Sequence, residues 1–291
     1  MDVTLTAFVE QVANGTMMGA IYVLVALGLV LIFGVMEVLN FAHGIIFMAG
    51  GYVCDVFFVH VIGSYPLAVV LTMLTLAIVG VALERAVFRR LRVNIPMQIV
   101  ASLGLILMAE NIAVLIFGPS ALQLTVPSVK SLVRIGELSF TVQHLVVIVV
   151  CVVAIVLLQI FLQYTRLGTA LRATSQNAEA ARVIGIDADR IYRLTFATGC
   201  ALAGLGGACW ALYRETLTAD IGGEVIVLVF IVIIVGGLGS IGGCFLGAIL
   251  VAETANYAGY LAPKVALGSN VLLMLIVLMW RPQGLYPVAK R

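Results

Sequence analysis

The sequence is poor in charge. Asp, Glu, Lys and Arg make up 10% of its 291 residues, whereas a soluble globular domain carries roughly 25%. Apolar residues make up 63% and the mean hydropathy is +1.19, which excludes an ordinary soluble domain. The apolar runs are continuous and do not alternate with polar residues as the strands of an outer-membrane barrel do. Because a helix satisfies its own backbone hydrogen bonds in lipid, the sequence predicts an all-α polytopic membrane protein.

Basic residues are missing from the N-terminal stretch MDVTLTAFVEQVANG. A secretory signal needs a basic segment at its start and a cleavage site made of small residues. Neither feature is present, so the first apolar run is expected to be retained.

Motifs for nucleotide and metal binding are lacking as well. No lysine follows a glycine, so there is no Walker A motif, and any ATP hydrolysis must come from another chain. The three histidines and five cysteines show no metal-ligand spacing, and the cysteines are expected to act as small hydrophobic side chains. The Gly-x-Gly-x-x-Gly match at 237–242 lies between apolar segments and is rejected as a dinucleotide site. No cofactor, metal ion, catalytic residue or nucleic acid is expected.

What the chain does contain is a series of long apolar segments. A full membrane crossing needs about 20 residues, so the shortest segment, 225–235, does not cross alone. The stretch 119–143 carries prolines and β-branched residues and predicts an extended excursion such as a hairpin. The series predicts eight or nine membrane helical segments, at about 9–33, 44–62, 65–88, 97–118, 144–163, 191–213, 225–235, 244–260 and 268–281.

Lys and Arg are distributed unevenly over the connecting stretches. Three clusters, at 85–92, at 166–193 and at the C-terminus from Arg281, hold 12 of the 16 basic residues if they share one side. Loops rich in Lys and Arg stay in the cytoplasm. This predicts a cytoplasmic C-terminus and an N-terminus outside.

Two of the apolar regions are interrupted by glycine-containing breaks. The first break, Gly34–Gly44, also holds Glu37, and the second, Gly236–Gly243, is almost entirely Gly and Ser. Their similar positions indicate broken helices and a weak repeat of two halves. Paired interruptions of this kind point to a transporter's substrate route, although glycines also simply allow close helix packing. The candidate route residues are Asn40, His43, Gly44, Gly236, Gly237, Gly239 and Ser240.

Three acidic residues fall inside or beside apolar segments: Asp55, Glu110 and Glu253. An ionisable group in a membrane span is costly and therefore a candidate for function. The alternative is a hydrogen bond at a helix end or between helices. If functional, these acids would fit a stand-alone carrier driven by an ion gradient.

The most polar stretch of the chain is 164–193, which carries five arginines and three acids. Asn177 is a suitable N-cap, Gly185 a suitable stop, and Asp187 or Asp189 can begin the next helix. A short two-turn helix on the cytoplasmic surface is therefore predicted, the alternative being an ordinary solvated loop. The residues expected to contact an energy-supplying partner are Asn177, Glu179, Ala180, Ala181, Arg182 and Gly185.

The segment SQNAEAARVIGID resembles the cytoplasmic coupling loop of bacterial ABC importer permeases, whose pattern is Glu-Ala-Ala followed by Gly. Further motifs, in order and spread from about 14 to 285, resemble the branched-chain amino-acid permease family. They are NFAHG (40–44) with Met48 and Tyr52, Glu84-Arg85, YTRLGTALRA (164–173), IGID (184–187), GGLGSIGG (236–243) and RPQGL (281–285).

The resemblance implies a permease subunit of the bacterial inner membrane that carries leucine, isoleucine, valine or related amino acids. It also implies four partners in addition to the lipid bilayer: a second homologous permease, two cytoplasmic ATPase subunits, and a periplasmic or extracellular solute-binding protein. A sister group of permeases carries urea or short amides and is the alternative. A single permease domain over 1–291 is expected, with a first half at about 9–118, a coupling loop at 164–193 and a second half at about 191–285. An intramembrane enzyme is disfavoured, because no nucleophile–base motif is recognisable.

Overall fold

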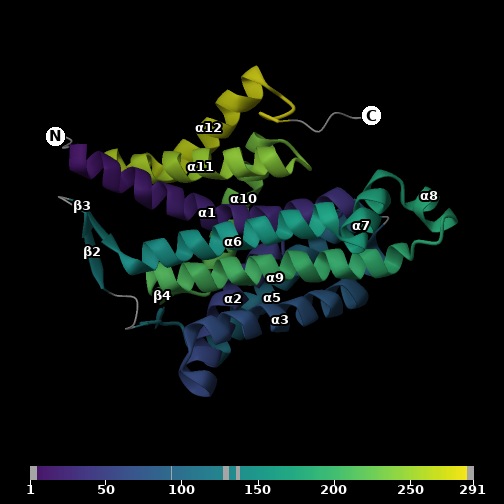
Figure 1. Ribbon diagram of the computed structural model, residues 1–291, viewed down its shortest axis with the longest axis horizontal. Coiled ribbons are helices and arrows are strands. Elements are labelled where there is room, and N and C mark those ends of the chain that lie inside the picture. The colour runs from purple at the N-terminus through teal and green to yellow at the C-terminus, as the bar shows by residue number, and fades with distance from the viewer. Residues whose placement is uncertain (1–4, 93, 127–130, 136–137, 287–291) are drawn as a thin grey trace.

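The computed structural model describes residues 5–92, 94–126, 131–135 and 138–286. Long helices run side by side along the long axis of the molecule (Figure 1). Within the described ranges, seven helices are long and apolar enough to cross a membrane, and two shorter apolar helices accompany them. Each of the nine predicted apolar segments falls on one of these helices, so the prediction of an all-α polytopic membrane protein is confirmed.

The helices follow the chain in a simple order, with two π-helical turns and one 3₁₀ turn attached to them. They are α1 (Leu5–Met36), α2 (His43–Val56) with η1 (Phe57–Ile62), α3 (Tyr65–Leu83) with η2 (Glu84–Phe88) and α4 (Arg89–Leu91), α5 (Ile95–Phe117), α6 (Val142–Tyr164), α7 (Arg166–Gln176), α8 (Ala178–Val183), α9 (Ala188–Arg214), α10 (Ile221–Gly236), α11 (Ile241–Leu261) with η4 (Pro263–Val265), and α12 (Ala266–Trp280).

Short strands lie at one end of the helices. β2 (Leu132–Ile135) and β3 (Leu138–Thr141) pair as an antiparallel hairpin, with Val133 opposite Phe140. This confirms the hairpin expected in 119–143. β1 (Leu122–Gln123) pairs with β4 (Thr216–Leu217), which ties this loop to the end of α9. The strands lie at the left of Figure 1, and we call this end the hairpin end.

The centre of the bundle is formed by α1 and α9, which are buried along most of their length. Small residues let them approach closely: a Cβ atom on Gly28 would lie 2.6 Å from the carbonyl oxygen of Gly199. Gly50 of α2 packs in the same way on Gly204 of α9. Small residues at helix contacts are the usual means of close packing in membranes, where apolar side chains gain nothing by leaving lipid.

The outer helices α3, α5, α6 and α12 expose large apolar side chains. Leu115 on α5 is 83% exposed, and only 11% of the most apolar window of α5 is buried. Such a surface fits lipid or another membrane helix. Of the seven long helices, α5 is therefore the least buried within the chain.

The five cysteines are all buried and free. They lie in apolar helices, where they pack as small hydrophobic side chains.

Candidate functional site

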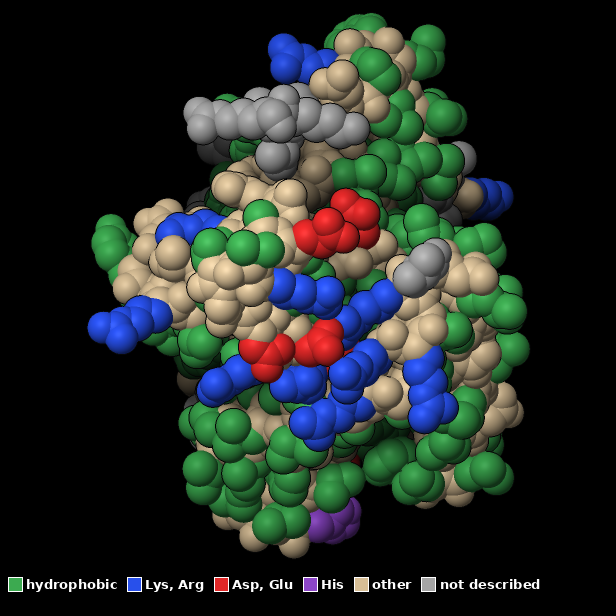
Figure 2. Space-filling model, turned by 90° about the vertical axis from the view of Figure 1, so that its right-hand side faces the viewer, with side chains coloured by type: hydrophobic (Ala, Val, Ile, Leu, Met, Phe, Trp, Pro, Cys, Tyr) green, Lys and Arg blue, Asp and Glu red, His purple; other side chains and the backbone are tan. Residues whose placement is uncertain are grey.

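Basic side chains gather at the end of the bundle opposite the hairpin. Figure 2 views this end directly and shows Lys and Arg side chains surrounding small groups of acids. The clusters at 85–92 and 166–193 meet here, as their ion pairs show. Lys290 and Arg291, predicted on the same side, lie outside the described residues. We call this surface the arginine-rich end.

Helix α8 projects from this end (Figure 1) and has the boundaries that its sequence predicts. The side-chain oxygen of Asn177 accepts a hydrogen bond from the backbone N–H of Ala180 at 2.9 Å, which caps the helix. Gly185 has φ of +90°, and the N–H of Ile186 bonds back to the carbonyl of Ala181 at 3.0 Å. A left-handed residue closing the last turn is the usual helix stop. The expectation of a short capped helix, rather than an ordinary loop, is confirmed.

One face of α8 packs on the protein and the other is open. Ala181 is buried, whereas Glu179, Ala180 and Arg182 are exposed. The helix ends in two large apolar side chains that are almost free: Val183 is 88% exposed and Ile184 is 74% exposed. Unlike the apolar side chains of the outer helices, these two lie in a polar segment, between the exposed Arg182 and Arg190 in the sequence.

Helix α7, which precedes α8, was not predicted. Thr165 caps it, accepting a hydrogen bond from the N–H of Gly168 at 3.0 Å. Leu171 and Thr174 are buried against the bundle, and Arg172 faces outwards. A threonine followed by Leu at i+2 and i+6 is a helix signal, and it could have been read from the sequence.

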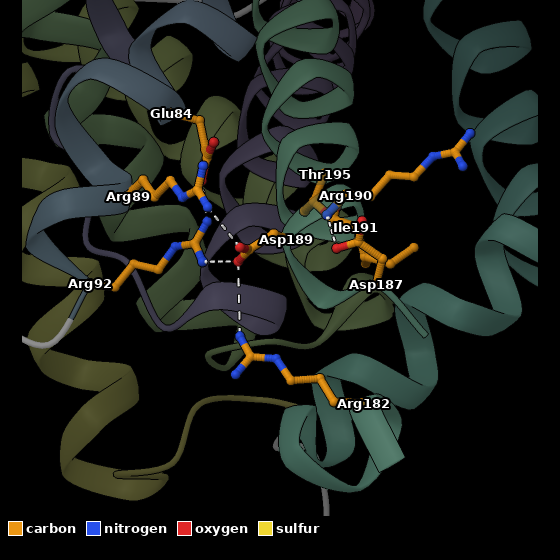
Figure 3. A network of polar contacts seen from close by, with 9 residues as sticks. All are labelled: Glu84, Arg89, Arg92, Arg182, Asp187, Asp189, Arg190, Ile191 and Thr195. Atoms are coloured by element: carbon orange, nitrogen blue, oxygen red, sulfur yellow. Dashed lines mark hydrogen bonds and ion pairs between the residues drawn. The ribbon is translucent and has the colours of Figure 1, made fainter. Parts of the chain in front are cut away.

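Asp189 joins three arginines at the start of α9 (Figure 3). Its carboxylate accepts hydrogen bonds from Arg92 at 2.8 Å and Arg89 at 3.0 Å. Arg182 of α8 lies 3.9 Å away. The neighbouring Asp187 has a different role: it caps α9 through the N–H of Arg190 at 3.0 Å. The structure therefore resolves the two alternatives for the start of α9 in favour of Asp187.

Glu84 extends this cluster into the protein. Its side chain is fully buried and pairs with Arg92, whose guanidinium also lies 4.3 Å from the centre of the Tyr192 ring. The adjacent Arg85 is exposed. We call Glu84, Arg89, Arg92, Arg182 and Asp189 the ion cluster. It joins the segment that follows α3 to the end of α8 and the start of α9, and sequence reasoning missed it.

The first break turns the chain between α1 and α2. Glu37 has φ of +53° and is exposed. Asn40 is 1% exposed, and neither polar atom of its side chain has a hydrogen-bond partner among the described residues. His43 is fully buried, with Nε2 3.1 Å from the carbonyl oxygen of Val25. His43 thus holds α2 against α1, and Asn40 is left as an unsatisfied buried amide.

The second break is a tight turn between α10 and α11. Gly237 and Gly239 both have positive φ, at 108° and 82°, and Ser240 caps α11 by accepting a hydrogen bond from the N–H of Gly243 at 3.1 Å. The segment 281–286 lies on this turn: Tyr286 N–H donates to the carbonyl of Gly236 at 2.9 Å. Sequence reasoning does not predict that contact, because the two segments are far apart in the chain.

A cleft of about 400 Å³ brings one glycine of each break together. Gly34 and Gly239 line it, between α1, α6 and α7. Its other walls are apolar residues of α1 and α6, with Gln163 and Arg172 among the polar groups. Asn40, His43 and Gly44 do not line this cleft; Gly44 instead packs on Gly222 of α10. The structure therefore connects the two breaks only in part.

The three acids near the spans occupy separate places. Thr16 donates a hydrogen bond to Glu253 at 3.2 Å, joining α1 to α11. Asp55 is buried on α2, and Glu110 lies on α5 near Gly223. For Glu253 this is the interhelical hydrogen bond that was the alternative to a functional role. Among the residues that the structure describes, no group of three His, Cys, Asp or Glu side chains is arranged to hold a metal ion.

Comparison with known proteins identifies the family. Residues 11–280 match the family model described as branched-chain amino acid transport system / permease component. The chain is 28% identical to the high-affinity branched-chain amino acid transport system permease protein LivH of Salmonella typhimurium, over 96% of this chain and 95% of the relative. It is 28% identical to LivH of Escherichia coli K12 and 27% identical to BraD of Pseudomonas aeruginosa, with the same coverage. No solved structure matches.

The match covers every membrane helix, both breaks and the arginine-rich end. This chain is thus a multi-pass membrane protein that belongs to the branched-chain amino acid transport permease family.

Proposed function

We propose that this chain is the permease subunit of an ABC importer for branched-chain or related amino acids, in the bacterial inner membrane. The single observation that carries the proposal is family membership over nearly the whole chain, combined with a capped helix that projects from the arginine-rich end. The chain contains no Walker A motif, so the energy is supplied by separate ATPase subunits. The whole chain acts as one permease domain with two halves joined through the coupling loop 164–193.

Helix α8 is the contact for the ATPase. Its arginine-rich surroundings support a cytoplasmic position, because loops rich in Lys and Arg stay inside. With this orientation the start of α1 lies outside and the C-terminus inside. Val183 and Ile184 form an exposed apolar tip, and exposed apolar residues of a polar surface mark protein interaction sites. A partner with an apolar pocket and an acidic rim would match this tip and the surrounding arginines.

The substrate route follows the breaks. Non-helical backbone is tolerated in a membrane where protein or a water-filled cavity covers it, and part of each break is buried: Asn40 in the first, and Gly236 and Gly237 in the second. The unsatisfied Asn40 amide offers a donor and an acceptor in the interior, while the cleft at Gly34 and Gly239 provides space near the cytoplasmic end. Solute would pass Asn40 first and leave by the cleft, after rigid-body movements driven by the ATPase.

The remaining components of the importer would be a second homologous permease and an external solute-binding protein. The exposed apolar side chains of the outer helices α3, α5, α6 and α12 offer a surface for another membrane subunit, above all on the barely buried α5.

The test is uptake by the complete complex in proteoliposomes. ATP-dependent uptake of leucine, isoleucine or valine is expected, together with loss of uptake in Glu179→Lys while the protein still inserts. Uptake that follows an ion gradient without any ATPase would contradict the proposal, and urea or amide uptake would move the chain to the sister group.

A further inference from the structure

Gln98, near the start of α5, is fully buried, and its amide uses both its donor and its acceptor capacity. The side-chain nitrogen donates to the carbonyls of Leu91 at 3.0 Å and Arg92 at 3.1 Å. The side-chain oxygen accepts a hydrogen bond from the backbone N–H of Leu39 at 3.2 Å. One side chain therefore joins the segment that carries Arg92 to the first break, where Leu39 lies 59 positions before Gln98.

The two ends of this connection belong to the two sites described above. Arg92 pairs with Asp189 and Glu84 in the ion cluster, which also includes Arg182 of α8. Leu39 precedes Asn40, the unsatisfied amide of the first break. A continuous chain of polar contacts thus runs from α8 through Asp189, Arg92 and Gln98 to the first break.

We propose that Gln98 is a positioning residue that couples the ion cluster to the first break, so that movement of α8 changes the conformation around Asn40. Its importance for transport rests on the proposed function, whereas the coupling is a property of this chain alone.

The local packing supports a mechanical link at this point. Of the seven long helices, α5 is the least buried within the chain, and Gln98 lies in its first turn, six positions after Arg92. A shift of Arg92 therefore either carries Gln98 and Leu39 with it or breaks their hydrogen bonds. Breaking them is costly, because the groups are buried and water does not replace the lost partner.

Position in a chain of contacts does not by itself show energetic coupling, so the test is a double-mutant cycle. The measured quantity is hydrogen exchange of the backbone in residues 37–42, in the purified full-length chain without partners. Gln98→Leu removes all three hydrogen bonds and is expected to speed exchange there about tenfold. Ser102→Ala is the matched control, because Ser102 is also buried on α5 but bonds only to Ile99 of its own helix.

The decisive variant is Asp189→Asn, which changes no atom near the first break. It is expected to speed exchange at 37–42 in the native background and to add nothing in the Gln98→Leu background. Unchanged exchange in Asp189→Asn, or independent effects that multiply in the double variant, would overturn the coupling. If Gln98→Leu fails to fold, Gln98→Glu replaces it. Its carboxylate still accepts a hydrogen bond from the N–H of Leu39 but repels the carbonyls of Leu91 and Arg92. Protection from exchange at 37–42 should therefore persist, and the response to Asp189→Asn should be lost.

Transport gives a second readout with the complete complex. Gln98→Leu is expected to keep ATP hydrolysis and lower uptake per ATP, since α8 is untouched. Equal loss of hydrolysis and uptake would contradict the positioning role. If the native complex shows no ATP-dependent uptake, the proposed function fails, but the exchange result still decides whether Gln98 couples the two sites.

Discussion

Asp189 and Arg92 are 97 positions apart, yet their side chains meet at 2.8 Å at the arginine-rich end of the bundle. The bond joins the turn after α4 to the first turn of α9, beside α8. Because Arg92 also pairs with the buried Glu84, the Asp189–Arg92 pair helps to hold α8, the proposed binding element for the ATPase, against the membrane helices.

Asp189→Asn should therefore lower stability and weaken the link to α8. The variant loses charge-assisted hydrogen bonds to Arg92 and Arg89, each worth about 1.5–3 kcal/mol when well formed; partial exposure of the cluster reduces this value. We expect the midpoint of thermal unfolding of the purified protein to fall. Asp187→Asn is the control, since Asp187 only caps α9 and Asn caps as well as Asp. An equal fall in both variants would contradict a specific role for Asp189.

Arg92→Met tests the buried half of the ion cluster. Removing one partner of a buried ion pair leaves an unpaired charge and costs about 3–5 kcal/mol, so a large loss of stability is expected. The double variant Glu84→Gln/Arg92→Met removes both charges and should recover part of that loss. Arg85→Met, at an exposed neighbouring position, should change little. Denaturant unfolding of the four proteins measures these differences; no recovery in the double variant would show that Glu84 and Arg92 act separately.

The caps of α8 and α9 could be read from the sequence, but the ion cluster could not. Asn177, Gly185 and Asp187 act on backbone groups within a few residues, so their chemistry is visible locally. The partners of Asp189 depend on how α3 packs against α9. Arg92 lies only eight residues after Glu84, but with four arginines nearby nothing in the sequence selects Arg92. The continuous apolar runs likewise located the membrane helices, because length and hydropathy are local properties.

Gly185→Ala and Gly104→Ala should change stability in opposite directions. Gly185 has φ of +90°, and an alanine in the left-handed region costs roughly 1–2 kcal/mol. Nothing lies within 4 Å of the position that a Cβ would occupy, so the cost is conformational and should appear as loss of uptake with normal insertion.

Gly104→Ala is the comparison for this substitution. It also meets open space but lies inside α5, where replacing Gly by Ala stabilises a helix by roughly 0.5–1 kcal/mol. Uptake and the midpoint of thermal unfolding, measured for both variants, test this difference. Normal uptake in Gly185→Ala would contradict the need for the turn after α8.

Val183→Ser/Ile184→Ser should weaken binding of the ATPase and leave folding unchanged. Both side chains are exposed in the free chain, so the change in folding stability should be within about 0.5 kcal/mol. Loss of apolar anchors in an interface costs about 1–2 kcal/mol or more, which would appear as weaker co-purification with the ATPase and lower uptake. Val61→Ser, at an exposed apolar position of η1, is the control. Unchanged ATPase binding would show that the apolar tip is not part of the interface.

Gly34→Leu tests the cleft as the exit of the substrate route. Gly34 is exposed and lines the cleft, and nothing lies within 4 Å of the position of its Cβ. A leucine can therefore enter the cleft without displacing the packed core, and should obstruct solute while the protein folds, inserts and binds its ATPase. The expected result is low uptake with ATP hydrolysis retained.

The matched control for Gly34→Leu is Gly259→Leu. Gly259 is also exposed and has open space around its Cβ position, but it lies on α11 away from both breaks. Uptake in this control should remain normal. If Gly34→Leu also transports normally, solute does not leave through the cleft.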